Sequence, residues 1–282
     1  MPWRSAGLLI ALAAAPAIVS GQSPTQSLPP YLRDRGTGVR MSMLGTYVRD
    51  GELLIYPFFE WYTDHNLEYK PSELGYGLNN DYRGRFHASE GILFFAYGIS
   101  PDVAVEFESA VITAELRKSA SDTATVPQRV RESGLGDVEG QIRWRVQREN
   151  EHRPEIYTFF ETVFPLQRTR HIIGTQDWEF SAGFGLTRGF SWGTMTLRAS
   201  AEYAREARQI DAGEYAIEYM RQFSPAWRVI TAIEGSQVDE ISLLTELQWR
   251  FARNAILKMN SGLGLTPNAT DFAPEVGIMF NF

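Results

Sequence analysis

Hydrophobic and polar residues alternate along most of the chain, in segments of about ten residues. In the segment 275–282, EVGIMFNF, the even positions are all apolar, whereas the odd positions include Glu275, Gly277 and Asn281. Successive side chains of a β-strand point to opposite faces, so this period of two predicts a strand with one apolar and one polar face. The segment 138–147 repeats the pattern with a heavily charged polar face.

The alternation predicts twelve strands. They cover residues 52–64, 86–98, 102–116, 134–148, 154–164, 177–188, 192–204, 212–223, 226–236, 239–250, 254–265 and 273–282. Long links near 65–85, 117–133 and 165–176 alternate with short ones at 100–101, 188–191, 224–225 and 252–253, and only the 237–238 link is shorter than this scheme expects. An even number of strands with short turns at one end and longer loops at the other is typical of an outer-membrane β-barrel.

Closure of the sheet follows from the physics of lipid. An open sheet edge in hydrocarbon leaves N–H and C=O groups without partners, at several kcal/mol each. The expected fold is therefore all-β: a transmembrane antiparallel up-and-down β-barrel of about 12 strands. The Met-rich segment 39–48 also alternates and leaves two interpretations open, a plug inside the lumen or an extra strand that pairs with part of 66–80 to make 14 strands.

The N-terminus resembles a secretory signal peptide. Arg4 precedes an apolar run from Leu8 to Val19, which at about 12 residues is too short for a membrane-spanning helix of about 20. Small residues at 19–21 predict cleavage before Gln22. The expected organisation is a signal peptide at 1–21, an N-terminal linker and possible plug segment at 22–51, and the barrel at 52–282.

Composition narrows the function classes. The chain has 282 residues, 44% of them hydrophobic, with a mean hydropathy of -0.25, a net charge of -7 and a pI near 5.3. The hydropathy disfavours a helical membrane protein, and the acidic balance gives no electrostatic footprint for nucleic acid. The absence of cysteine excludes disulfides, thiolate catalysis, Cys-based metal sites and a lipoprotein anchor. The four histidines are too scattered for a metal cluster, so we expect neither a metal nor a cofactor.

Charged residues of the polar face are expected to line the lumen, because charge at the lipid face costs a few kcal/mol. The candidates are Glu106, Glu108, Glu139, Arg143, Arg145, Glu179, Arg198, Glu202, Glu218, Glu246, Arg250 and Lys258. Both signs are interspersed along the sequence, which predicts a mixed lumen that selects weakly for charge. Asp137 also faces inward, as a lumen carboxylate or as a hydrogen-bond acceptor for the local turn.

Aromatic residues mark the two membrane interfaces. Trp144, Trp227 and Trp249 are expected near the periplasmic ends of their strands, and Trp61 and Trp178 near the external ends. The terminal Phe282, with Phe280 two residues earlier on the same face, resembles the signature that outer-membrane barrels present to their insertion machinery.

One pattern suggests catalysis. His87 and Ser89 lie two residues apart on one face of a strand. Outer-membrane phospholipases use such a His-x-Ser pair together with a polar third residue on a neighbouring strand, and here Asn66 or Asp64 could supply that residue. A serine nucleophile needs an adjacent imidazole, and the imidazole needs an orienting partner. Because such a triplet is common by chance, we expect no enzyme and no catalytic residue.

The second half of the chain resembles an outer-membrane family named for the MetA pathway of phenol degradation, a group of transporters in Gram-negative bacteria. The resemblance rests on SGLGDV at 133–138, Phe164-Pro165, GFG at 183–185 and the ending 274–282. It implies a channel or transporter for small, often aromatic or hydrophobic, solutes. The expected setting is the outer membrane of a Gram-negative bacterium, in contact with lipid and lipopolysaccharide; the alternatives are a structural or assembly-partner barrel without transport, and the lipid hydrolase.

Overall fold

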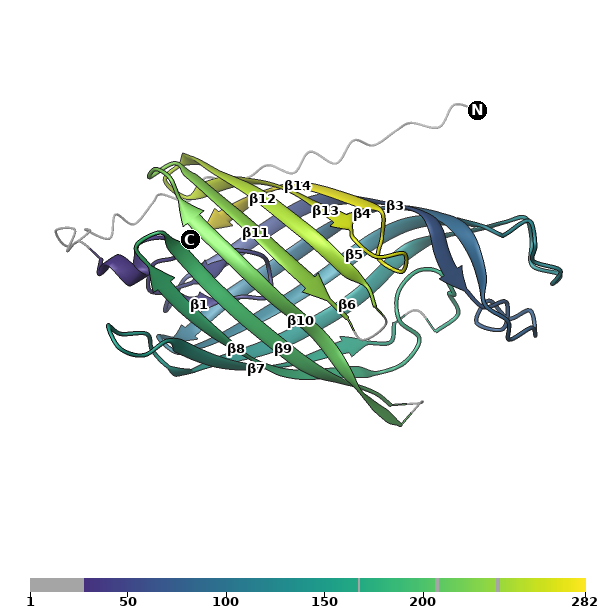
Figure 1. Cartoon of the computed structure of the whole chain (residues 1–282), viewed down its shortest axis with the longest axis horizontal. Helices are drawn as coiled ribbons and strands as arrows, with labels where there is room; N and C mark the ends of the chain where they lie inside the picture. Colours follow the sequence, from purple (N-terminus) through teal and green to yellow (C-terminus); the bar gives the residue numbers. More distant parts are fainter. Residues whose placement is uncertain (1–27, 167, 206–207, 237–238) are drawn as a thin grey trace, which may run out of the picture.

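The chain forms a closed antiparallel barrel of twelve strands, seen from the side in Figure 1. The structure is a computed structural model that describes residues 28–166, 168–205, 208–236 and 239–282, so the expected signal peptide lies outside the described residues. The strands are β3 (Leu53–Tyr69), β4 (Tyr82–Ser100), β5 (Val103–Arg117), β6 (Arg129–Gln147), β7 (Glu155–Phe164), β8 (Glu179–Phe190), β9 (Gly193–Ala204), β10 (Gln209–Gln222), β11 (Trp227–Gly235), β12 (Ile241–Ala252), β13 (Ala255–Gly264) and β14 (Phe272–Asn281). Each of the twelve expected strands is confirmed.

Every strand of the barrel pairs with its neighbours in sequence, and β14 closes the ring against β3. At this seam Leu53 and Phe282 exchange backbone N–H···O bonds of 3.1 and 2.9 Å. Among the described residues, no helix is long and apolar enough to cross a membrane.

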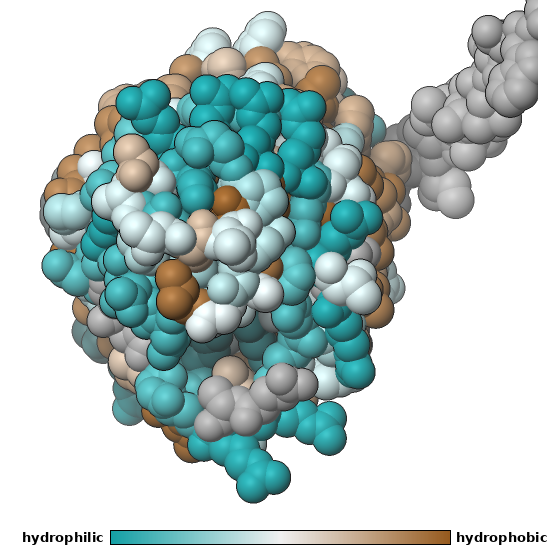
Figure 2. Space-filling model, turned by 90° about the vertical axis from the view of Figure 1, so that its right-hand side faces the viewer, coloured by the Kyte–Doolittle hydropathy of each residue, from teal (hydrophilic) through white to brown (hydrophobic). Residues whose placement is uncertain are grey.

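Alternation decides which side chains face outward. In β5, Phe107 and Val111 are exposed, whereas the residues that directly precede them, Glu106 and Ala110, are buried. We call the end with the longer loops the loop side, and the end with the short turns and both ends of the barrel domain the turn side. Figure 2 looks onto the loop side, where hydrophilic residues predominate and hydrophobic residues lie along the flanks.

Four strands continue beyond the rest of the barrel on the loop side. The sequence predicts a long link at 65–85, but β3 runs on to Tyr69 and β4 begins at Tyr82. β14 pairs with β3 only as far as Thr63, and β7 pairs with β6 only from Val138. The sheet extension therefore consists of 64–69, 82–88, 114–117 and 129–135. Alternation predicted only its part nearest the barrel (64, 86–88, 114–116 and 134–135), because a sheet outside the membrane needs no continuous apolar face.

The N-terminal segment lies inside the barrel, at the turn side of Figure 1. This plug, residues 28–51, contains a short 3-10 helix, η1 (Pro30–Leu32), and a hairpin of β1 (Val39–Arg40) and β2 (Tyr47–Val48). Val39 and Val48 are fully buried and join an apolar cluster with barrel residues such as Tyr56. β1 pairs only with β2, so the interpretation with 14 strands is wrong for the described residues: side-chain contacts, rather than strand pairing, hold this segment.

Inward-facing glycines make room for aromatic rings on the neighbouring strand. A Cβ atom on Gly185 would overlap the ring of Tyr157, and one on Gly183 would overlap the ring of Phe159. Tyr157 is fully buried, with the guanidinium carbon of Arg143 5.2 Å from its ring centroid. A Cβ atom at position 185 would therefore have to displace a buried ring.

We expect Gly185→Ala to destabilise the barrel by about 1–3 kcal/mol, the usual cost of overpacking. Gly91→Ala is the matched control, because a Cβ atom there has no neighbour within 4 Å. Urea unfolding of the two variants in detergent micelles measures the difference. Equal unfolding midpoints for Gly185→Ala and Gly91→Ala would show that the Tyr157 ring can move aside without loss of stability.

Candidate functional site

A buried ion pair joins the plug to the barrel wall. Arg40 Nη1 and Nη2 donate to the two carboxylate oxygens of Glu218 at 2.5 and 2.8 Å. The backbone N–H of Gly45 also donates to this carboxylate, at 3.4 Å. Both side chains of the pair are almost completely buried. A two-pronged arginine–carboxylate pair fixes orientation as well as distance, so the plug has one defined position at this point.

Lys258 of β13 makes a second contact with the plug. Its ammonium group donates to the carbonyl oxygen of Leu44 and the hydroxyl of Thr46, both at 3.1 Å. It also lies 3.1 Å from Glu246 on the neighbouring strand. On the opposite wall, Glu106 accepts a hydrogen bond from the backbone N–H of Ser42 at 3.1 Å.

Arginines and glutamates hold the plug again near the turn side. Arg35 of the plug pairs with Glu149 at 2.8 Å and with Glu155 at 3.0 Å. Burial opposes the charge of Arg35, but the carboxylates of Glu155 and Glu149 outweigh it and raise the pKa of this guanidinium. Arg145 of β6 pairs with Glu155 at 3.2 Å and donates to the carbonyl oxygens of Thr37 and Gly38.

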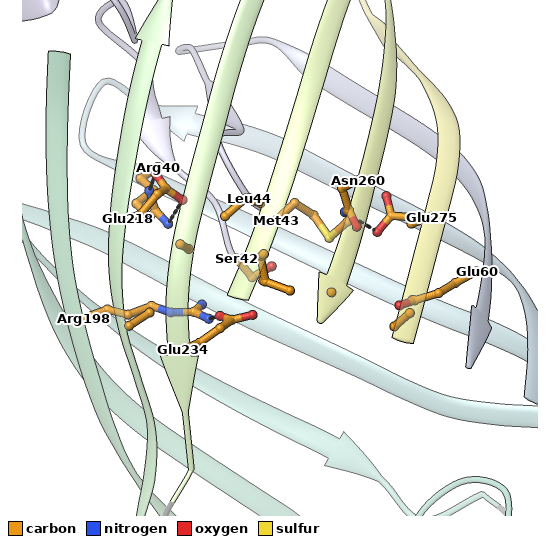
Figure 3. Close-up of a pocket in the computed structure, with 15 residues that line it drawn as sticks. Arg40, Ser42, Met43, Leu44, Glu60, Arg198, Glu218, Glu234, Asn260 and Glu275 are labelled. Carbon is orange, nitrogen blue, oxygen red and sulfur yellow. Dashed lines mark hydrogen bonds and ion pairs between the residues drawn. The ribbon is translucent and has the colours of Figure 1, made fainter. Parts of the chain in front are cut away.

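Between these anchors, the tip of the plug forms the floor of an open space. Met43 borders three cavities of about 220, 370 and 330 Å³ on the loop side of the plug, which together we call the loop-side chamber. Figure 3 shows the first of them, with Ser42, Met43 and Leu44 of the plug between the Arg40–Glu218 and Asn260–Glu275 pairs.

Charge in the lumen is segregated by height. The chamber is bordered by twelve carboxylates (Glu60, Glu90, Glu108, Asp137, Glu139, Glu161, Glu179, Glu202, Glu214, Glu218, Glu234 and Glu275) and three guanidinium groups (Arg40, Arg143 and Arg198). A cavity of about 320 Å³ at the turn side of the plug is bordered by six arginines (Arg33, Arg35, Arg49, Arg228, Arg250 and Arg253) and one carboxylate, Glu52. Both signs occur in the lumen, as expected, but in unequal proportions on the two sides of the plug. Alternation predicts whether a side chain faces the lumen or the outside. The height of that side chain along the barrel axis depends on the register between strands, which alternation does not give.

All twelve candidate lumen residues lie on the inner side of the barrel, at three levels. Glu108, Glu139, Arg143, Glu179, Arg198 and Glu202 border the chamber. Glu106, Arg145, Glu246 and Lys258 lie at the level of the plug, as does Glu218, which also borders the chamber. Arg250 borders the turn-side cavity. Sequence reasoning missed Glu60, Glu90, Glu161, Glu214 and Glu234, although each lies on the inner face of its strand. It also missed Arg40, whose role depends on where the plug docks.

Arg143 is the least paired cation of the chamber. Its side chain is only 1% exposed, and Nε and Nη2 both donate to the side-chain oxygen of Gln141. The guanidinium lies over the rings of Tyr157 and Phe159, 5.2 and 5.0 Å from their centroids. Among the described residues, Nη1 of Arg143 has no hydrogen-bond acceptor.

The β7–β8 loop folds against the mouth of the chamber. Glu132 accepts the backbone N–H groups of His171 and Ile172, and Asp137 accepts that of Thr175 at 2.5 Å. Ile173 packs against the inner wall in an apolar cluster with Ala88 and Ala114. Asp137 therefore borders the chamber and also fixes this loop, which lies far along the chain from the turn considered in the sequence.

Aromatic side chains lie at both ends of the outer face. Trp227 stacks on Trp249 with ring centroids 5.6 Å apart at the turn side, where Trp144 is also exposed. Trp61 meets Phe59, and Trp178 meets Phe164, toward the loop side. Sequence reasoning missed Trp192, which lies between Phe190 and Tyr219 at the turn side. The terminal residue Phe282 is 66% exposed, and Phe280 is half-buried.

His87 and Ser89, the pair considered for a lipid hydrolase, lie on the outer face of β4. His87 is opposite Thr63 of β3, and Ser89 is opposite Trp61. Asp64 is buried, and its carboxylate accepts the backbone N–H of Asn66. Within the described part of the chain, no hydrogen bond joins His87 to Ser89, and no group of three or more His, Asp or Glu residues is placed to hold a metal ion.

Asp102, in the turn after β4, helps to hold Arg145, which in turn contacts the plug. Its substitution therefore measures how much this ion-pair cluster stabilises the protein. Hydrogen bonds from Arg148 at 2.7 and 2.8 Å, and from Arg145 at 3.1 Å, lower the pKa of this carboxylate below its ordinary value of 3.8. The stabilisation is therefore fully present above pH 3.8 and is lost as the pH falls through the lower pKa of the folded state. We expect Asp102→Asn to cost up to about 1 kcal/mol at pH 7, the range of partly exposed ion pairs.

At pH 3 the difference in unfolding free energy between this variant and the parent should shrink, and denaturant titrations at both pH values measure it. A difference independent of pH would mean that Asp102 acts through packing or turn geometry.

The fold is similar to those of solved outer-membrane channels. The COG4313 outer membrane channel from Pseudomonas putida F1 matches with a TM-score of 0.59 and 14% identity, covering 83% of this chain and 96% of that chain. The KdgM porin in complex with disordered oligogalacturonate matches with a TM-score of 0.50 and 10% identity, covering 81% of this chain and 99% of that chain. No protein-family model and no curated protein matches the sequence. The chain therefore shares the closed β-barrel fold of these outer-membrane proteins.

Proposed function

We propose that this protein is a channel in the outer membrane of a Gram-negative bacterium and admits small solutes from the outside. The observation that carries the proposal is an acidic chamber on the loop side of a plug that is held by ion pairs. The loop side then faces the exterior and the turn side the periplasm, as in other barrels with short periplasmic turns. The similarity in fold to outer-membrane channels supports this placement.

The chamber favours solutes that carry both positive charge and an apolar part. A cavity with one sign of charge and low-dielectric walls concentrates counter-ions. Apolar side chains, among them Phe58, Ile92 and Ile112, border the same cavity as Glu60 and Glu90. An aromatic or hydrophobic solute, as the MetA-pathway resemblance implies, would contact these side chains while a cationic group meets the carboxylates.

Passage requires that the plug shift. Its main anchors are ion pairs and hydrogen bonds, among them the buried pairs Arg40–Glu218 and Arg35–Glu149. When such a pair separates and both charged groups become hydrated, the hydration free energy that was lost on burial is regained. The net free-energy cost of breaking the pair is therefore modest. The plug is therefore a closure that can open without unfolding of the barrel.

The proposal also includes the insertion machinery and the membrane lipids as partners. Phe280 and Phe282 would be read by the insertion machinery, and the outer face would contact lipid and lipopolysaccharide. We propose no cofactor, no enzymatic activity and no binding of nucleic acid. A barrel that serves only as a structural or assembly partner would show no solute passage, and a lipid hydrolase would lose activity in Ser89→Ala.

Ion selectivity tests the chamber. In planar bilayers under a KCl gradient, the parent channel should prefer cations. Glu108→Gln with Glu139→Gln should reduce the permeability ratio of K⁺ to Cl⁻ at least about twofold, since both carboxylates border the chamber. Glu73→Gln with Glu151→Gln, at exposed positions outside the lumen, is the charge-matched control. Anion preference in the parent, or equal ratios in both variants, would contradict the proposal.

Conductance of plug variants tests the closure. Glu218→Gln leaves Arg40 buried without its carboxylate, a loss worth about 3–5 kcal/mol in other buried pairs. Because the other contacts of the plug remain, the free-energy change should be smaller than this. We expect the fraction of time that the channel is open to increase at least about tenfold. Single-channel recording of the full mature protein measures it. A silent, heat-modifiable parent and an equally silent Glu218→Gln would favour a barrel without transport.

A further inference from the structure

Four exposed arginines gather on the outer face of the sheet extension. Cross-strand pairing places Arg85 of β4 opposite Arg117 of β5, and Arg117 opposite Arg129 of β6. The next outward pair toward the barrel is Glu115 opposite Arg131. Like charges directly opposite each other destabilise a sheet. A row of three arginines on adjacent strands therefore needs a compensating anion.

Among the described residues, one carboxylate, that of Glu115, forms ion pairs with this group of arginines. Glu115 meets Arg117 at 2.8 Å, Arg129 at 3.2 Å and Arg131 at 2.9 Å. No described side chain forms a hydrogen bond or an ion pair with Arg85. Four guanidinium groups against one carboxylate leave three positive charges uncompensated, on side chains that are all exposed.

The height of this cluster matches the polar headgroups of a membrane. On the same outward face, Ser89 lies opposite Trp61, an interface aromatic, and Val111 and Leu135 below it are exposed apolar residues. The rows of Glu115 and Arg117 lie two and four residues farther along the strand than the row of Ser89. At about 3.3 Å per residue and a tilt near 40°, they stand roughly 5 and 10 Å above the tryptophan.

We propose that Arg85, Arg117, Arg129 and Arg131 form a binding site for the phosphate groups of a phosphorylated glycolipid in the outer leaflet, the lipid A part of lipopolysaccharide. Guanidinium groups bind phosphate oxygens in pairs and hold them more specifically than ammonium groups do. The acyl chains of the lipid then lie on the apolar face that carries Val111. A free phosphate ion would gain nothing from that face. The site rests on the outer-membrane placement proposed above.

Native mass spectrometry of the delipidated full mature protein in detergent tests the site, with lipid A, dephosphorylated lipid A and inorganic phosphate as separate probes. The parent should bind lipid A at least about tenfold more tightly than the dephosphorylated form. Arg117→Gln with Arg129→Gln should remove most of this difference. Arg148→Gln with Arg153→Gln, two exposed arginines at the turn side, should keep it.

Arg85→Gln is a second test, because it removes charge without breaking any described contact, and it should weaken lipid A binding several-fold. Equal binding of the two lipid forms, or equal binding of lipid A by parent and Arg117→Gln with Arg129→Gln, would overturn the site. Inorganic phosphate that competes at the same concentration as lipid A would overturn the assignment to a lipid. The variants of Arg85, Arg117 and Arg129 should keep the parental conductance, since their side chains face away from the lumen, so failure here is distinct from failure of the channel proposal.

Discussion

The hydrogen-bonding demand of the backbone in lipid governs this molecule. A strand in hydrocarbon has no water to satisfy its N–H and C=O groups, so the sheet must close on itself. Here the closure is made between the first and last strands, where Leu53 and Phe282 exchange backbone hydrogen bonds across almost the entire barrel sequence. Once the ring is closed, alternation assigns every second side chain to lipid and the others to the interior, and the chamber, the plug contacts and the outer face all follow from that assignment.

Local pattern was sufficient for the fold and for the direction of each side chain. Because alternation is a local property, Glu106 and Lys258 could be assigned to the interior from their immediate neighbours. Height and long-range contacts were not predictable in the same way. Arg40 and Glu218 are separated by 178 residues, and nothing near either residue shows that they meet. The segregation of charge also required the register of all strands, which depends on bulges such as that between Asp64 and Leu67.

The two kinds of contact around the plug differ in what they do. Val39, Met41 and Val48 pack with barrel residues such as Phe94 in a small apolar cluster, which contributes attraction without much direction. The arginine, lysine and glutamate contacts add direction and register at little net gain in stability. Together they produce a segment that is placed accurately and bound moderately, as a removable closure requires.

The opposite charges on the two sides of the plug have an electrical consequence. An acidic compartment in series with a basic one is the ionic counterpart of a semiconductor junction, because each compartment is enriched in a different carrier. A field of one polarity drives both carriers toward the boundary at Met43, and the reverse polarity depletes them there. An open pore with this arrangement would rectify, passing more current in one direction than in the other, and the sign of the rectification would report which way the barrel is inserted in the bilayer.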